Sequence, residues 1–174
     1  MKKILILLLL INLYTGCAKN EPIKLSSPYD AEQAKTMLEK GKMTLTGESF
    51  LRRTDGGVVT CAGQAVKLFP VTAYASERMR YIYGGTQQGY RSAMNFQLKP
   101  LDFTPDEPMY HVYEKKTFCD AQGHFKFSDM KPGKYYILTD VVWGPLPNRY
   151  YYEGGIIMQQ IDLQEDNQHF IFTR

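Results

Sequence analysis

The chain has 174 residues and a formal net charge of +3, and two of its positive charges, Lys2 and Lys3, lie at its amino end. The rest is close to neutral, so it lacks the clustered basic face of nucleic-acid-binding proteins, and we expect no nucleic-acid partner. The length suits one domain that buries a real core. The 13 tyrosines favour an all-β domain over a helical bundle.

The first residues have the layout of a secretory signal peptide, which we place at residues 1–16. Two lysines precede an apolar run from Ile4 to Leu13, and small residues follow the run. The run is about half of the roughly 20 residues that a bilayer-spanning helix needs, so a cleaved signal is the better interpretation. Ordinary signal peptidase cleavage after Ala18 is the alternative to cleavage before Cys17.

The segment Thr15-Gly16-Cys17 resembles the end of a bacterial lipoprotein signal, although Tyr14 stands where that pattern has a leucine-like residue. The resemblance implies that Cys17 carries diacylglycerol and an N-acyl chain. Such chains hold a protein firmly to a membrane, since each buried CH₂ contributes about 0.8 kcal/mol. Ala18 after the cysteine implies the outer membrane, facing the periplasm. Residues 17–29 then form the lipidated N-terminus and a polar tether.

A single domain is expected over residues 30–174, opening with a peripheral helix at 30–41. Asp30 caps this helix, Gln33 is its capping-box partner and Gly41 ends it. A second helix is expected at 74–83, ended by Gly84. Alternating polarity and turn residues predict strands at 43–53, 58–60, 65–70, 115–119, 124–127, 134–143, 156–163 and 168–174.

Two segments of the chain carry further expectations. Residues 134–143 are apolar on both faces in their middle, which is typical of a central strand. Residues 87–108 are weakly periodic and contain three prolines, so we expect them to form an irregular excursion over the surface.

Setting Cys17 aside leaves Cys61 and Cys119, an even pair in a chain that we expect to be exported. In an oxidising compartment such a pair forms a disulfide. The alternative is two separate buried thiols that behave as small apolar side chains. The chain has no C-x-x-C pair and no closely spaced His–Cys cluster, so we expect no metal site.

The series from Phe118 to Phe127, followed by Met130 to Tyr136, resembles the carboxypeptidase regulatory-like domains. Their recurring phrase joins a strand, D-x-x-G-x-F-x-F, a short L-x-P-G-x-Y turn and another strand. The resemblance covers residues 45–174, interrupted in the 70s–110s by an insertion that the minimal domain lacks. It implies an all-β, transthyretin-like Greek-key β-sandwich with one or two short peripheral helices. Such sandwiches are scaffolds with many functions, so the resemblance names no activity.

The pair His111 and Glu114 reads as H-x-x-E, the zinc-binding pair of metallocarboxypeptidases. On the extended chain expected here, positions i and i+3 face opposite sides, so the two side chains do not converge. The sequence also contains no G-x-S-x-G elbow and no phosphate-binding loop. We therefore expect no enzyme, no catalytic residues and no cofactor.

The most suggestive surface is the Pro-punctuated segment from Trp143 to Tyr152. It carries side chains of the types enriched at binding hot spots, namely Trp143, Arg149, Tyr150, Tyr151 and Tyr152. Alternatively, these tyrosines begin a strand and pack on the sandwich. The leading hypothesis is a non-enzymatic lipoprotein that interacts with an envelope protein. The second is a glycan- or peptidoglycan-binding module that uses this aromatic segment.

Overall fold

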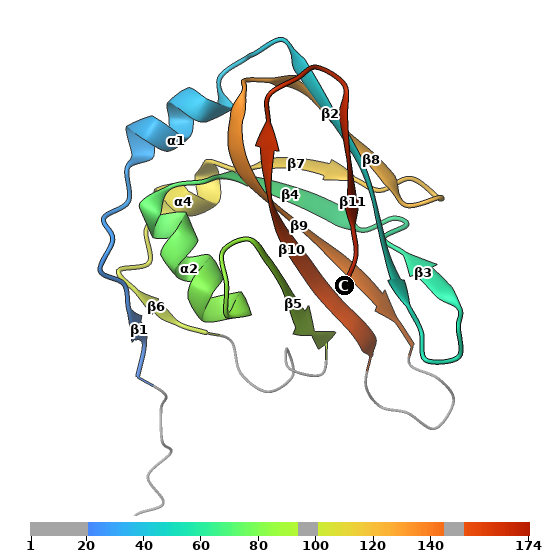
Figure 1. The fold of residues 1–174 in the computed structure, drawn as a ribbon. Coiled ribbons are helices and arrows are strands. Elements are labelled where there is room, and N and C mark those ends of the chain that lie inside the picture. Colours follow the sequence, from blue (N-terminus) through green and yellow to red (C-terminus); the bar gives the residue numbers. More distant parts are fainter. Residues whose placement is uncertain (1–20, 94–100, 145–151) are drawn as a thin grey trace, which may run out of the picture.

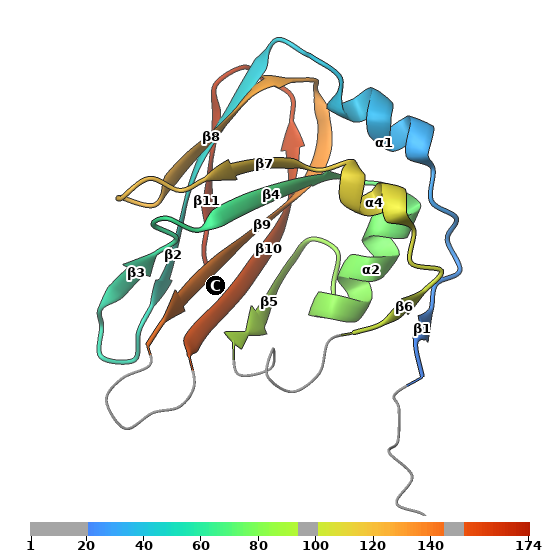
Figure 2. The ribbon, with the colours of Figure 1, turned by 180° about the vertical axis from the view of Figure 1, so that it is seen from behind.

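The computed structural model describes residues 21–93, 101–144 and 152–174, so the signal segment and Cys17 lie outside the described residues. Two β-sheets pack face to face, with short helices beside them (Figures 1 and 2). The expected all-β sandwich is confirmed. None of the helices in the described ranges is long and apolar enough to cross a membrane.

One sheet has five antiparallel strands. In spatial order they are β5 (Gln88–Ser92), β10 (Glu153–Leu163), β9 (Gly133–Trp143), β4 (Ala65–Pro70) and β7 (Lys115–Phe118). β9 is central, as predicted. Its side chains alternate between two apolar layers: Tyr135 and Ile137 face the inner core, whereas Tyr136 faces the opposite side.

The other sheet is built around β2 (Met43–Arg52). β11 (Gln168–Phe172) runs parallel to β2, whereas β3 (Val58–Thr60) and β8 (His124–Met130) pair with it antiparallel. β8 is three residues longer than the predicted 124–127, because its ladder with β2 continues as far as the pair Met43 and Met130. The turn between β8 and β9 therefore starts after Met130, later than the sequence suggested.

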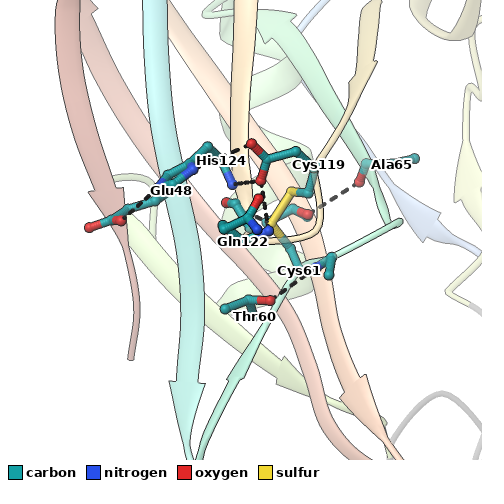
Figure 3. The surroundings of a disulfide bond; sticks show 11 residues. Glu48, Thr60, Cys61, Ala65, Cys119, Gln122 and His124 are labelled. Carbon is teal, nitrogen blue, oxygen red and sulfur yellow. Dashed lines mark hydrogen bonds and ion pairs between the residues drawn. A yellow bond between two sulfur atoms is a disulfide. The ribbon is translucent and has the colours of Figure 1, made fainter.

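The core between the two sheets is made of apolar side chains from both, and large members with no exposure include Leu45, Leu68, Met130, Tyr135, Ile137 and Phe172. Cys61 and Cys119 also lie in this core and form the predicted disulfide, with Cα atoms 5.8 Å apart. Figure 3 shows the bond beside the turn that carries Gln122. It joins the residues just after β3 and just after β7, so it links the two sheets.

A second apolar layer covers the outer face of the five-stranded sheet. Helix α2 (Ala73–Tyr83), helix α4 (Pro108–Val112) and the parallel pair β1 (Ile23–Lys24) and β6 (Phe103–Thr104) contribute to it. The prediction of an irregular 87–108 segment was wrong where β5, β6 and the start of α4 fall, at residues 88–92, 103–104 and 108. β5 is ordered by backbone pairing with β10, which requires no alternation of polarity.

Helix α1 (Ala31–Leu38) begins as predicted. The Asp30 carboxylate accepts a hydrogen bond from the backbone N–H of Gln33 at 2.8 Å. The helix ends at Leu38, before the predicted stop at Gly41. Gly41 has a different role, because a Cβ there would overlap the backbone carbonyl of Met130.

The expected tether, 17–29, is bound to the domain from Ile23 onward. The N–H groups of Ile23 and Leu25 donate to carbonyls beside and within β6, each at 2.8 Å. The Glu77 carboxylate accepts from the N–H of Ser26 at 3.0 Å and of Ser27 at 2.7 Å, and these bonds lower the pKa of Glu77 to about 2. The chain between Cys17 and Ile23 spans at most about 20 Å, about half the reach of the expected tether.

Candidate binding cleft

A cleft of about 770 Å³ opens at the end of the sandwich where β9 ends and β10 begins. One side is formed by the end of β2 with residues 52–54 and by Thr173 and Arg174, which follow β11. The other side is formed by β5 and by the paired ends of β9 and β10. The volume lies within the roughly 300–1,000 Å³ of small-molecule sites, so the cleft has room for one or two sugar rings.

Trp143 and Tyr90 supply the aromatic wall of the cleft. Trp143 is the last residue of β9 and pairs with Glu153 at the start of β10. Gly154 lies beneath the indole: its φ is +84°, and a Cβ there would be 2.7 Å from Cζ3 of Trp143. The indole N–H is buried and has no hydrogen-bond partner in the described part of the chain.

Arg52, Arg53 and Arg174 supply the cationic wall of the cleft. The Arg174 guanidinium carbon lies 4.6 Å from the centroid of the Tyr90 ring, a cation–π contact between the two walls. Arg53 forms an ion pair with Asp55, with 2.7 Å between Nη2 and Oδ2. The cleft thus combines aromatic faces with forked hydrogen-bond donors.

The predicted aromatic segment falls on the connection between β9 and β10 and is placed only in part. Trp143 lines the cleft, and Tyr152 is 49% exposed just before β10. Arg149, Tyr150 and Tyr151 lie outside the described residues, so their part in binding stays a prediction.

Sequence reasoning did not find Tyr90 or the three arginines of the cationic wall. These residues come from β5, from the end of β2 and from the segment after β11, so no local motif joins them. Tyr90 also falls in the segment that was expected to be irregular. The available signal was an excess of arginine where predicted strands end, and that pattern alone names no site.

The H-x-x-E pair does not lie on extended chain, so the argument that its side chains face opposite sides was wrong. His111 lies on the short helix α4 and not on extended chain. Its Nε2 is 3.3 Å from the Asp106 carboxylate, whereas Glu114 pairs with Lys67 at 3.5 Å. The two side chains are thus held by different partners. Within the described ranges, no three His, Cys, Asp or Glu side chains are grouped to hold a metal.

A cavity of about 390 Å³ lies under α2 and α4, and its lining holds these helices in place. Arg78, which is 7% exposed, lines it and pairs with Asp106 at 2.5 Å. The guanidinium carbon of Arg78 lies 4.2 Å from the Phe103 ring centroid and 4.8 Å from that of Tyr110. This cluster fixes α2 and α4 to each other and to β6.

Comparisons with known proteins bear on the fold. No protein-family model matches the chain, and no curated protein matches it. Among solved structures, the fold is similar to that of a proposed carbohydrate-binding protein from Pseudomonas aeruginosa, with a TM-score of 0.67. The two share 20% sequence identity, and the match covers 85% of this chain and 99% of that one. At this identity the likeness shows the sandwich fold alone.

Proposed function

We propose that this protein is an exported, non-enzymatic lipoprotein, anchored through Cys17 in the outer membrane and facing the periplasm, whose sandwich binds a glycan. The observation that carries the glycan function is the cleft. It sets the aromatic wall (Trp143 and Tyr90) against the cationic wall (Arg52, Arg53 and Arg174). Sugar rings stack their C–H faces on aromatic rings, and charged side chains hydrogen-bond their hydroxyls.

Two further points favour a glycan over a protein partner as the occupant of this cleft. Its volume of about 770 Å³ suits a small ligand, whereas protein interfaces are broad surfaces. The structural relative from Pseudomonas aeruginosa, which has the same fold, is itself described as a proposed carbohydrate-binding protein.

The test uses the mature protein purified in detergent. Trp143 is the sole tryptophan of the chain, so its fluorescence reports directly on the cleft. We expect glycan strands from cell-wall sacculi to change this fluorescence, and intact sacculi to retain the protein on sedimentation. Tyr90→Ala removes one face of the aromatic wall and should lower retention several-fold. Tyr81→Ala is the matched control, since Tyr81 is 49% exposed on α2, outside the cleft lining.

Two results of the sedimentation assay would contradict the glycan function. If Tyr90→Ala is retained as well as the unchanged protein while both stay folded by circular dichroism, the cleft is not the site. If the unchanged protein is not retained at all, it does not bind the cell-wall glycan.

The anchor needs a separate experiment. Mass spectrometry of the mature N-terminus should find Cys17 carrying a diacylglycerol group and an N-acyl chain. Cys17→Ser should release the protein from the membrane fraction. An unmodified mature chain that begins after Ala18 would contradict the anchor and leave the glycan function intact.

An envelope protein partner is the second candidate function. A shallow groove of about 590 Å³ runs past Phe118, which is 60% exposed at the end of β7, and past His124. An exposed phenylalanine beside a groove is a feature of protein contact surfaces. Co-purification of one envelope protein, lost on Phe118→Ser and without binding to sacculi, would favour this candidate over the glycan.

A further inference from the structure

The charge of the cleft identifies the class of glycan more narrowly. Its described lining contains three arginines and one acidic residue, Glu153. The arginines stand on one side, at the end of β2 and after β11, and the aromatic wall stands on the other. Because Arg174 already lies over the Tyr90 ring, a ligand in the cleft meets the Trp143 indole and the positive surface at the same time.

Two of the three arginines have no carboxylate partner among the described residues. Arg53 is engaged by Asp55 at 2.7 Å, whereas Arg52 takes part in no ion pair there and Arg174 only stacks on Tyr90. Both Arg52 and Arg174 are exposed, so they are not buried structural cations. Their guanidinium groups are available to an anionic ligand.

We propose that the ligand of the cleft is an acidic sugar, whose ring stacks on the aromatic wall while its carboxylate pairs with Arg52 and Arg174. This proposal rests on the proposed glycan function and names the ligand class. A guanidinium group matches a carboxylate through two parallel hydrogen bonds, and a neutral sugar offers no such partner. A uronic acid or a sugar with a lactyl carboxylate meets both requirements.

The test compares an oligogalacturonate with its methyl ester of the same length, in which each carboxylate is neutralised by a methyl group. The mature protein in detergent is titrated with each, and Trp143 fluorescence is followed. We expect the acid form to bind about tenfold tighter or more, which is the size of effect given by a hydrogen bond to a charged group. The advantage should shrink with added salt, because exposed charges are screened.

Single-charge variants locate the effect. Arg52→Gln and Arg174→Gln should each weaken binding of the acid form about tenfold and leave binding of the methyl ester unchanged. Arg80→Gln is the control, because Arg80 is exposed on α2, away from the cleft, and its loss changes the net charge equally. Circular dichroism shows whether each variant is folded.

Each remaining outcome overturns the proposal. Equal binding of both probes would exclude an acidic sugar as the preferred ligand, but it would not contradict the glycan function. Binding of neither probe also removes it, and retention on sacculi in the same preparation then decides whether the glycan function survives. An equal loss in Arg80→Gln would mean that overall charge, and not the cleft, attracts the acid form.

Discussion

The Cys61–Cys119 disulfide makes a quantitative prediction about stability. The bond closes a loop between residues 58 positions apart, and the chain-entropy relation gives about 4 kcal/mol for a loop of this length. Both side chains are buried, so the double variant Cys61→Ala/Cys119→Ala removes the constraint without exposing a polar group. We expect its free energy of unfolding to fall by up to about 4 kcal/mol, with a Tm about 10 °C lower.

The assay is urea unfolding, followed by far-ultraviolet circular dichroism and by Trp143 fluorescence. The same titration of the reduced, unsubstituted protein is the control, because it keeps both sulfur atoms and loses only the constraint. The double variant and the reduced protein should then differ only by the packing lost with the two sulfur atoms. The slope of the transition should rise in both, since an unconstrained unfolded chain exposes more surface.

A difference below about 1 kcal/mol between the oxidised and reduced protein would refute this reasoning. It would mean that the unfolded chain is already compact around the two cysteines. Equal thiol titration of the unfolded exported protein before and after reduction would show that the bond does not form.

Two further predictions concern the ends of the domain. Glu77→Gln should weaken hydrogen-exchange protection of residues 23–27, whereas Glu32→Gln, on exposed α1, should not. In the unchanged protein that protection should be full above pH 4.5 and lost as the pH falls toward 2, since folding lowers the pKa of Glu77 from 4.5 to about 2. Gly154→Ala should shift the tryptophan emission and lower stability by more than Gly63→Ala. Both glycines have positive φ, but only at Gly154 would the new Cβ overlap the Val141 carbonyl oxygen and the Trp143 indole. An unchanged tryptophan emission in Gly154→Ala would contradict the contact between Gly154 and the indole.

The sequence was most informative where structure depends on near neighbours. The Asp30 carboxylate accepts a hydrogen bond from the N–H of Gln33, only three residues further along the chain, and Gly84 ends α2 in the left-handed conformation. The alternation along β2 and the apolar run of β9 follow from the two-residue repeat of a strand. The cysteine pair was predicted from parity and compartment, without geometry.

Among the described residues that line the cleft, only Trp143 was predicted from the sequence. The cleft exists because the end of β2, the short strand β5 and the segment after β11 meet at one end of the sandwich. Each of these segments is held there by strand pairing and by core contacts with residues far away in the chain. The sequence around Tyr90 or Arg174 therefore does not predict that these segments lie together.

By itself, the sequence determined the all-β class, the disulfide partners, the Asp30 cap of α1 and the Gly84 stop of α2. These depend on residue type, count and local spacing, which can be read directly from the chain. Only the tertiary structure decided that residues 23–29 belong to the domain, that β5 completes the sheet, and that aromatic and cationic walls face each other across one cleft. Each of these three features depends on backbone hydrogen bonds and apolar contacts between segments that are distant in the sequence. Which segments pair is determined only when the whole core packs.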